Sequence, residues 1–285
     1  MRIAVTGASG FIGRHVVAEL ERRQVSSVLV SRGPGQHPAG TRHTIVSMDI
    51  TDAPIDAFDR MGQPEALIHL AWGGLPHYGS LHHVERELPA QYMFLKRLVE
   101  SGLRKLVIAG TCLEYGLQSG ALAETHDTRP SNPYALAKDA LRRQLECLQA
   151  TVPFQLTWAR LFYMYGEGQP STSLLPQLVS AVERGDREFP MSGGEQLRDY
   201  LPVGDVARHL VALAMDDRDH GIVNVCAGTP VSVRALVERW IAERGWTIAP
   251  ALGRYPYPDY EPLAFWGDAR KLHALMSHEF VSETS

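Results

Sequence analysis

Three glycines follow the first apolar run of the chain at regular spacing: Gly7, Gly10 and Gly13. Residues 2–6 are apolar enough for a buried strand and residues 11–23 are amphipathic, so the glycines mark a strand-to-helix turn. There the first glycine permits the bend, the second lets a phosphate approach the backbone, and the third lets the helix sit close to the sheet. Amides at the helix N-terminus then favour an anion. We therefore expect a dinucleotide, rather than a turn without a ligand, held by Gly7, Ser9, Gly10, Phe11, Ile12 and Gly13.

Short apolar runs alternate with amphipathic runs through the first half of the chain. Strands separated by helices form right-handed crossovers and a parallel sheet that is covered on both faces. The fold class that follows is α/β: a doubly wound parallel sheet of the Rossmann type with a smaller C-terminal substrate-binding region. The expected strands are residues 2–6, 27–31, 44–48, 66–71, 105–109 and 154–161, and the expected helices are residues 11–23, 84–101 and 133–150.

The second half of the chain is less regular, and no composition break marks a linker. We expect a dinucleotide-binding domain over residues 1–162 and a mainly substrate-binding region over residues 163–285, with segments near 200–228 returning to the first domain. The expected elements are helices over residues 174–184, 203–215 and 231–244, a strand over 222–225, and a packed loop rich in Pro, Tyr and Trp over 246–266.

The composition of the chain limits the kinds of partner that we expect. The formal net charge of the 285 residues is −4, and no run of Lys or Arg forms a phosphate track, so no nucleic-acid partner is expected. No apolar stretch reaches membrane-spanning length, and the chain enters a strand directly after Met1, so we expect no membrane partner, no signal peptide and a cytoplasmic protein. The three cysteines lack metal-ligand spacing; we expect reduced core residues and no metal site.

The residues after the second expected strand bear on which dinucleotide binds. A carboxylate there would bind the ribose 2′-hydroxyl of NAD, whereas this chain has Ser31 and Arg32. A hydroxyl and a guanidinium suit the 2′-phosphate of NADP. We therefore favour NADP(H) and keep NAD(H) as the alternative, in which Arg32 is a solvated loop residue.

A tyrosine and a lysine four residues apart begin the expected helix 133–150. Tyr134 and Lys138 therefore share one helix face. A phenol ionises near pH 10 in water, and an adjacent ammonium lowers that pKa, so a positioned tyrosine can exchange a proton with a carbonyl or alcohol oxygen. Thr111 lies at the end of the fifth strand, at the sheet edge where open α/β folds bind ligands, and its hydroxyl could hold the same oxygen. Without Thr111, a surface pair would be the better interpretation.

In order along the chain, these motifs resemble the extended short-chain dehydrogenase/reductases, also called the NAD-dependent epimerase/dehydratase family. The likeness covers residues 1 to about 230. It rests on the glycine turn, Asp49-Ile50, His69-Leu70-Ala71, Thr111-Cys112-Leu113-Glu114-Tyr115-Gly116, Asn132-Pro133-Tyr134 with Lys138, Arg160 to Gly166, and Leu197 to Ala207.

The resemblance implies a role for each matching residue. Tyr134 is the general acid/base, Lys138 holds the nicotinamide ribose and tunes Tyr134, and Thr111 orients the reacting oxygen. Arg198 matches an arginine that grips the diphosphate of a nucleotide sugar; the alternative is a salt bridge to Asp199 or Asp205. The remaining expected cofactor contacts are Asp49 and Ile50 beside the adenine, with Leu70, Ala71 and Trp72 along the cofactor path, and the remaining substrate contacts are Cys112 and Tyr163.

Three departures from the family pattern narrow the chemistry. Sugar-nucleotide dehydratases carry an Asp-Glu pair after the threonine, but Cys112 and Leu113 stand here, so dehydration is not expected. Tyr163 occupies a position that is often Asn, which puts the usual diphosphate contact in doubt. Arg32 favours a cofactor that arrives as NADPH and leaves oxidised. The closest likeness is to reductases of 4-keto-6-deoxy nucleotide sugars, such as dTDP-4-dehydro-6-deoxyglucose reductase.

The leading hypothesis is therefore a nicotinamide-dependent 4-ketoreductase of a nucleoside-diphosphate 6-deoxy-sugar. Three rivals stay open: a nucleotide-sugar epimerase with bound NAD, a reductase of a non-sugar carbonyl compound, and a non-catalytic dinucleotide sensor. A homodimer is expected through helices 84–101 and 133–150, although Leu88, Tyr92, Leu95 and Leu98 could instead pack on the sheet.

Overall fold

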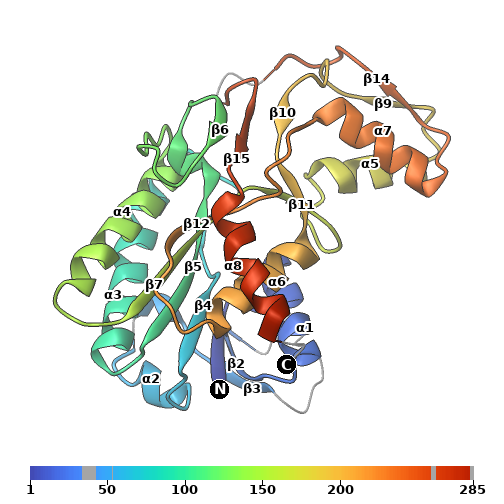
Figure 1. Ribbon diagram of the computed structural model, residues 1–285. Helices are drawn as coiled ribbons and strands as arrows, with labels where there is room; N and C mark the ends of the chain where they lie inside the picture. The colour runs from blue at the N-terminus through green and yellow to red at the C-terminus, as the bar shows by residue number, and fades with distance from the viewer. Residues whose placement is uncertain (34–42, 53, 258–260, 283–285) are drawn as a thin grey trace.

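A seven-stranded parallel sheet forms the centre of the protein (Figure 1). The structure, a computed structural model, describes residues 1–33, 43–52, 54–257 and 261–282. The strand order is β12-β7-β5-β4-β1-β2-β3, so the chain changes direction across the sheet between β1 and β4. The strands are β1 (Arg2–Thr6), β2 (Ser26–Ser31), β3 (His43–Ser47), β4 (Ala66–His69), β5 (Lys105–Thr111), β7 (Gln155–Leu161) and β12 (Gly221–Val225). This confirms the predicted doubly wound α/β fold.

The central strands are buried along their whole length. All four residues of β4 and all seven of β5 are buried, as a parallel sheet covered on both faces requires. β5 runs two residues beyond its predicted end because Gly110 and Thr111 still pair with Arg160 and Leu161 of β7. This longer pairing carries Thr111 to the carboxyl edge of the sheet.

Helices cover the two faces in separate layers, each with its own core (Figure 1). On one face lie α3 (Leu88–Glu100) and α4 (Pro133–Gln149), and on the other α1 (Phe11–Arg22), α6 (Val203–Met215) and α8 (Arg270–Ser282). Helix α8 was not predicted, yet Leu272 on it is fully buried in the core with α1 and α6. Leu95 and Leu98 are fully buried against the sheet, so neither can form a dimer contact. The dimer itself stays a prediction.

A smaller lobe lies beyond the carboxyl edge of the sheet, at the upper right of Figure 1. Leu178, Leu236 and Trp240 are buried in its separate core. It contains α5 (Leu174–Glu183), α7 (Val233–Arg244), β9 (Glu188–Pro190), β10 (Leu197–Arg198), β13 (Val231–Ser232) and β14 (Ala249–Ala251). The prediction of a loop over residues 246–266 was wrong in part, because β14 pairs with β9 within it. The domain boundary at residue 162 stays a prediction.

Four further short strands join this lobe to the sheet. β8 (Tyr163–Tyr165) pairs with β11 (Tyr200–Pro202), and β15 (Phe265–Gly267) pairs with β6 (Gly120–Leu122). Each is three residues long, which is too short for a periodic pattern in the sequence. The remaining short elements are α2 (Ala57–Arg60), the 3-10 turns Ile50–Asp52 and Cys112–Tyr115, and the π-helical turn His83–Glu87, where the predicted helix 84–101 begins.

In the described ranges, no helix combines the length and the apolar character needed to cross a bilayer. Of the three cysteines, Cys112 and Cys226 are buried and Cys147 is exposed, and all three are free thiols. The expectation of core cysteines was therefore wrong for Cys147, which lies on the outer side of α4.

Candidate active site

The glycine turn is shaped by its own packing and leaves the helix end open to an anion. Gly7 has a φ of +71°, and a Cβ at Gly13 would lie 2.1 Å from the Gly7 carbonyl oxygen, so neither position accepts a side chain. Gly10 is the N-cap of α1 and, having no side chain, makes no side-chain cap bond there. The amides of Phe11 and Ile12 in the first turn of α1 are thus available to an anionic ligand. These donors fit the pyrophosphate of a dinucleotide.

Ser31 and Arg32 lie where the sequence places the adenosine end of the cofactor. Ser31 ends β2 and donates its hydroxyl hydrogen to the Gly33 carbonyl at 2.8 Å. Arg32 is exposed and lies close enough to Asp49 for its charge to help lower the pKa of that carboxyl; the hydrogen bonds from Thr51 are the larger cause.

Ile50 and the residues after β4 complete the expected cofactor wall. Ile50 is buried, and its side chain belongs to the core rather than to an open surface. Ala71 contacts the glycine turn directly: its amide donates to the Thr6 hydroxyl at 3.4 Å and would lie 2.9 Å from a Cβ at Gly7. Leu70 is half-buried and packs on the core. The structure thus brings the ends of β1 and β4 together.

Thr111, Tyr134 and Lys138, the proton-transfer cluster, lie on β5 and the first turns of α4. Asn132 caps α4 by accepting from the Ala135 amide at 2.9 Å, which fixes the helix start. Tyr134 and Lys138 are both buried, and Lys138 Nζ donates to the Ala109 carbonyl of β5 at 2.9 Å. This bond ties the face of α4 that carries Tyr134 and Lys138 to the strand that ends in Thr111.

Burial controls the ionisation of the tyrosine and the lysine. Burial raises the pKa of Tyr134 above its usual value, with smaller contributions from Tyr78, Glu114 and Cys112. Burial lowers the pKa of Lys138 to about 7, against the opposing charges of Glu114 and Glu87. The expectation that the ammonium lowers the tyrosine pKa was therefore wrong for the protein alone: desolvation dominates, and Lys138 bonds to a carbonyl. Tyr134 is held in its protonated form.

Aromatic rings surround the tyrosine. The rings of Tyr78 and His83 both lie 5.3 Å from that of Tyr134, centroid to centroid, and the Trp72 ring lies 6.0 Å away. Trp72 also lies under the lysine, with Lys138 Nζ 3.9 Å from its ring centroid. Trp72 Nε1 donates to His83 Nδ1 at 3.1 Å. Trp72 was expected along the cofactor path, whereas the contacts of His83 with Tyr134 were not foreseen.

A second polar group, the Glu261 cluster, consists of the buried residues Cys112 and Arg198 and the half-buried residues Tyr163 and Glu261. Arg198 Nη2 donates to Glu261 Oε2 at 3.0 Å, and the Tyr163 hydroxyl donates to Glu261 Oε1. Burial, followed by the charge of Glu261, raises the pKa of Cys112, so its thiol is neutral. The three expected substrate residues Cys112, Tyr163 and Arg198 thus meet around a carboxylate that sequence reasoning did not single out.

Neither predicted alternative partner of Arg198 is its partner in the structure. Asp199 accepts hydrogen bonds from the amides of Ala227 and Gly228 at 2.6 and 2.8 Å. Asp205 pairs with Arg208 within α6. Glu261 stands 63 residues beyond Arg198, so no local pattern could have indicated the pair. The described part of the chain contains no group of three or more His, Cys, Asp or Glu side chains placed to hold a metal ion.

The chain is similar to enzymes of nucleotide sugars over nearly its whole length. The sequence profile of the NAD dependent epimerase/dehydratase family matches residues 3–226. The dTDP-6-deoxy-L-talose 4-dehydrogenase (NAD(+)) of Aggregatibacter actinomycetemcomitans is 30% identical over 94% of this chain and 99% of its own. A UDP-glucose 4-epimerase of Halalkalibacterium halodurans is 27% identical over 84% and 79%. The solved structure of MoeE5 with UDP-glucuronic acid and NAD has a TM-score of 0.82 and 27% identity, covering 97% of this chain and 93% of its own.

Proposed function

Because the chain belongs to the NAD dependent epimerase/dehydratase family, we propose that it reduces the 4-keto group of a nucleoside-diphosphate 4-keto-6-deoxyhexose with NADPH. The observation that carries this proposal is a proton-transfer cluster in which neither of the two residues that follow Thr111 in the sequence is a carboxylate. Cys112 there is a buried neutral thiol and Leu113 is an alkyl side chain, so neither can act as the acid that eliminates water. The relatives named as 6-deoxy-talose 4-dehydrogenases and as a GDP-6-deoxy-D-mannose reductase support redox chemistry on a deoxy-sugar.

Each residue of the cluster has a distinct part in the reduction. When bound, the nicotinamide supplies the hydride for the carbonyl carbon. Tyr134 gives its proton to the carbonyl oxygen, and its burial keeps that proton in place until the oxygen gains charge. The Thr111 hydroxyl oxygen already accepts from the Leu113 amide at 3.2 Å, so its hydrogen is free to donate to the same substrate oxygen. Lys138 places a positive charge behind both.

Arg32 supports NADPH over NADH in this proposal. Its guanidinium is exposed directly after β2, where the 2′-phosphate of NADP would lie, whereas NAD would favour a carboxylate there. The names of two relatives specify NAD(+) and NAD(P)(+), so the family accommodates both. The amides of the glycine turn would hold the pyrophosphate of either cofactor.

For the substrate, Arg198 supplies the buried cation that suits a diphosphate, with Tyr163 and Cys112 beside it. We also propose a homodimer through α3 and α4, because Met93 and Leu136 expose large apolar side chains on these helices. Light scattering on the purified protein tests the dimer.

The proposed activity is tested with dTDP-, GDP- and CDP-linked 4-keto-6-deoxyhexoses and NADPH, following loss of NADPH absorbance. We expect one sugar nucleotide to be reduced with one NADPH consumed per sugar. An absorbance scan of the purified protein separates the rival epimerase, because an epimerase keeps its NAD through the reaction. Tightly held NAD together with interconversion of sugar epimers, and no net NADPH loss, would refute the proposal.

A further inference from the structure

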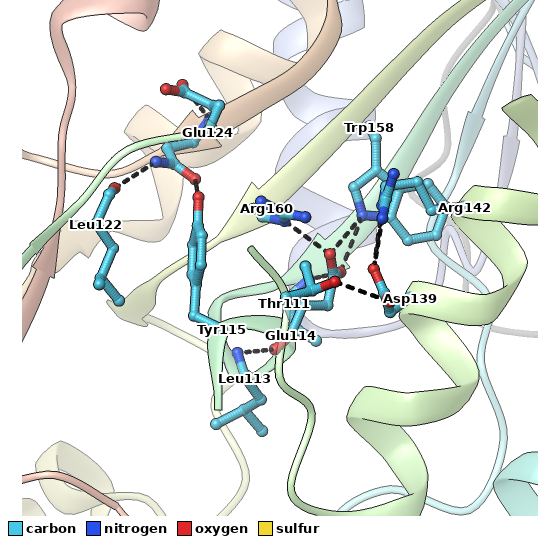
Figure 2. Close-up of polar contacts among 12 residues, drawn as sticks. Thr111, Leu113, Glu114, Tyr115, Leu122, Glu124, Asp139, Arg142, Trp158 and Arg160 are labelled. Carbon is cyan, nitrogen blue, oxygen red and sulfur yellow. Dashed lines mark hydrogen bonds and ion pairs between the residues drawn. The ribbon is translucent and has the colours of Figure 1, made fainter. Parts of the chain in front are cut away.

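A buried glutamate lies directly behind the reacting threonine (Figure 2). Glu114 is completely buried and accepts hydrogen bonds from three groups. Its Oε1 accepts from the Thr111 amide at 2.9 Å and from Trp158 Nε1 at 2.9 Å, and its Oε2 accepts from Arg160 Nε at 2.7 Å. Thr111, Trp158 and Arg160 lie on the neighbouring strands β5 and β7, so one carboxylate joins the two strands at their carboxyl ends.

Glu114 and Arg160 form an ion pair that is buried in the protein. Both side chains are at most 1% exposed, and Arg160 Nη1 has no hydrogen-bond partner among the described residues. The guanidinium lies 4.5 Å from the Tyr115 ring centroid. Removing two charges from water costs more free energy than a single ion pair usually returns, so apolar replacements of equal volume are often as stable. The position of the pair therefore points to a purpose other than stability.

The glutamate controls how Thr111 is presented. Thr111 caps the 3-10 turn Cys112–Tyr115 through a reciprocal pair of bonds: its hydroxyl oxygen accepts from the Leu113 amide, while its own amide donates to Glu114. The Leu113 amide occupies one acceptor site of the hydroxyl oxygen, and the hydroxyl hydrogen has no partner assigned within this turn. That hydrogen can therefore be donated to a carbonyl oxygen that gains negative charge.

The Glu114 carboxylate and the Trp158 ring lie close to the backbone of β5. A Cβ at Gly110 would lie 2.2 Å from Trp158 Nε1 and 2.8 Å from Glu114 Oε1, so only glycine fits at this position while both side chains keep their places. The charge of Glu114 also raises the pKa of Lys138 and of Tyr134, which helps both groups to keep their protons.

We propose that Glu114 is a positioning residue of the reaction, which acts through the Thr111 amide to aim the Thr111 hydroxyl at the reacting oxygen. The proposal rests on the proposed function for its reaction, while the hydrogen bond at its centre can be measured without any substrate. Glu114 touches neither cofactor nor sugar in this scheme; it is effective because Thr111 touches the sugar.

Two double variants separate the hydrogen bond from the charge. Glu114→Gln with Arg160→Gln removes both charges but keeps an oxygen for the Thr111 amide, while the new carboxamide nitrogen donates to the side chain at position 160. Glu114→Leu with Arg160→Met removes both charges and the acceptor at similar volume. Changing both partners together avoids leaving a buried charge unpaired. Each variant is compared with Thr111→Val and with its own combination with Thr111→Val.

We expect the Leu/Met pair to lower kcat by about 10- to 100-fold with KM and the NADPH Kd nearly unchanged, and the Gln/Gln pair to lower it by less than about 3-fold. In the Thr111→Val background the Leu/Met pair should cost less than about 2-fold more, because the residue it acts through is already lost. A purely structural role would instead give a similar further loss in both backgrounds, and this result would overturn the proposal. So would full kcat in the Leu/Met pair.

Hydrogen exchange of the Thr111 amide provides the readout that needs no substrate. We expect protection of this amide in the wild type and in the Gln/Gln pair, and faster exchange in the Leu/Met pair. Equal protection of the Thr111 amide in all three proteins would contradict the proposed hold of Glu114 on Thr111. If the wild type reduces none of the sugars but the exchange pattern holds, the proposed function fails and the hold of Glu114 on Thr111 stands.

Discussion

The charged groups of the two polar clusters of the site have different partners. In the proton-transfer cluster, Lys138 bonds to the neutral Ala109 carbonyl and lies over the Trp72 ring. In the Glu261 cluster, Arg198 already has a carboxylate partner in Glu261. The groups of the first cluster are therefore already in place before any substrate binds. In the second, the diphosphate of the proposed substrate would have to compete with the Glu261 carboxylate for the Arg198 guanidinium.

The clusters also differ in how the chain assembles them. Tyr134 and Lys138 stand one helical turn apart, and Thr111 ends a strand that packs against that helix. Arg198 and Glu261 are 63 residues apart and come together on short strands and connecting segments. Under the proposed function, local structure assembles the groups for proton transfer, whereas long-range packing assembles the groups for substrate binding. The predictions below test this division, from the largest expected effect to the smallest.

The largest expected effect tests whether Tyr134 is the proton donor. Tyr134→Phe removes the acidic hydrogen but keeps the ring packed against Tyr78 and His83. We expect kcat for reduction to fall by about 10²- to 10⁴-fold with the NADPH Kd within about 2-fold of wild type. Fluorescence titration measures the Kd. Tyr255→Phe, at an exposed tyrosine, is the control and should be silent. If Tyr134→Phe turns over near the wild-type rate, Tyr134 is not the proton donor and the proposed mechanism is wrong.

The ionisation of Lys138 should appear in the pH profile. Burial lowers its pKa from 10.5 to about 7, so the free enzyme loses the ammonium as the pH rises through about 7. We expect kcat/KM for NADPH, which reports groups of the free enzyme, to fall about tenfold per pH unit above that value. Lys138→Met should be slower overall and lack this limb. A limb that persists in Lys138→Met belongs to another group.

Arg32 tests whether the cofactor end of the site was interpreted correctly. Arg32→Ser should lower the preference for NADPH over NADH by about 10-fold, because one charge-assisted hydrogen bond to the 2′-phosphate is lost. The kcat/KM with NADH should hardly change. Arg60→Ser, at another partly exposed arginine, is the control. If the preference for NADPH over NADH does not change, Arg32 is a solvated loop residue and gives no reason to favour NADP over NAD.

A variant of Glu261 tests whether this carboxylate competes with a ligand for Arg198. Glu261→Gln removes the charge that competes for Arg198 while it keeps an oxygen for hydrogen bonding, so we expect dTDP or UDP to bind about 3- to 10-fold more tightly by calorimetry. Glu195→Gln is the matched control, since Glu195 bonds to the exposed Tyr257 instead. Weaker binding in Glu261→Gln would mean that the carboxylate itself holds the ligand.

Much of the sheet could be predicted because its signals are local. The glycine turn and the buried runs of β4 and β5 each lie within a few neighbouring residues. The pair Tyr134 and Lys138 is equally local, since helix periodicity alone places both on one face. Helix α8 has no comparable pattern, and its position follows from burial of Leu272 against α1 and α6.

The substrate side resisted prediction for a physical reason. Glu261 is paired by a contact between distant segments, and β15 is a three-residue strand whose partner β6 lies far back in the chain. Glu114 was visible within its motif, but its importance depends on three donors that meet it only after β5 and β7 have paired. The tyrosine pKa was misjudged because a sequence shows the nearby ammonium and not the burial.

The close contact at Gly110 has a consequence for how such enzymes diversify. No side chain fits there while Glu114 and Trp158 keep their places, so a mutation at any one of the three is constrained by the other two. Gly110, Glu114, Trp158 and Arg160 should then be inherited or replaced as a set. We expect chains that share this quartet to form a group that sequence comparison can recognise, whichever sugar each member binds.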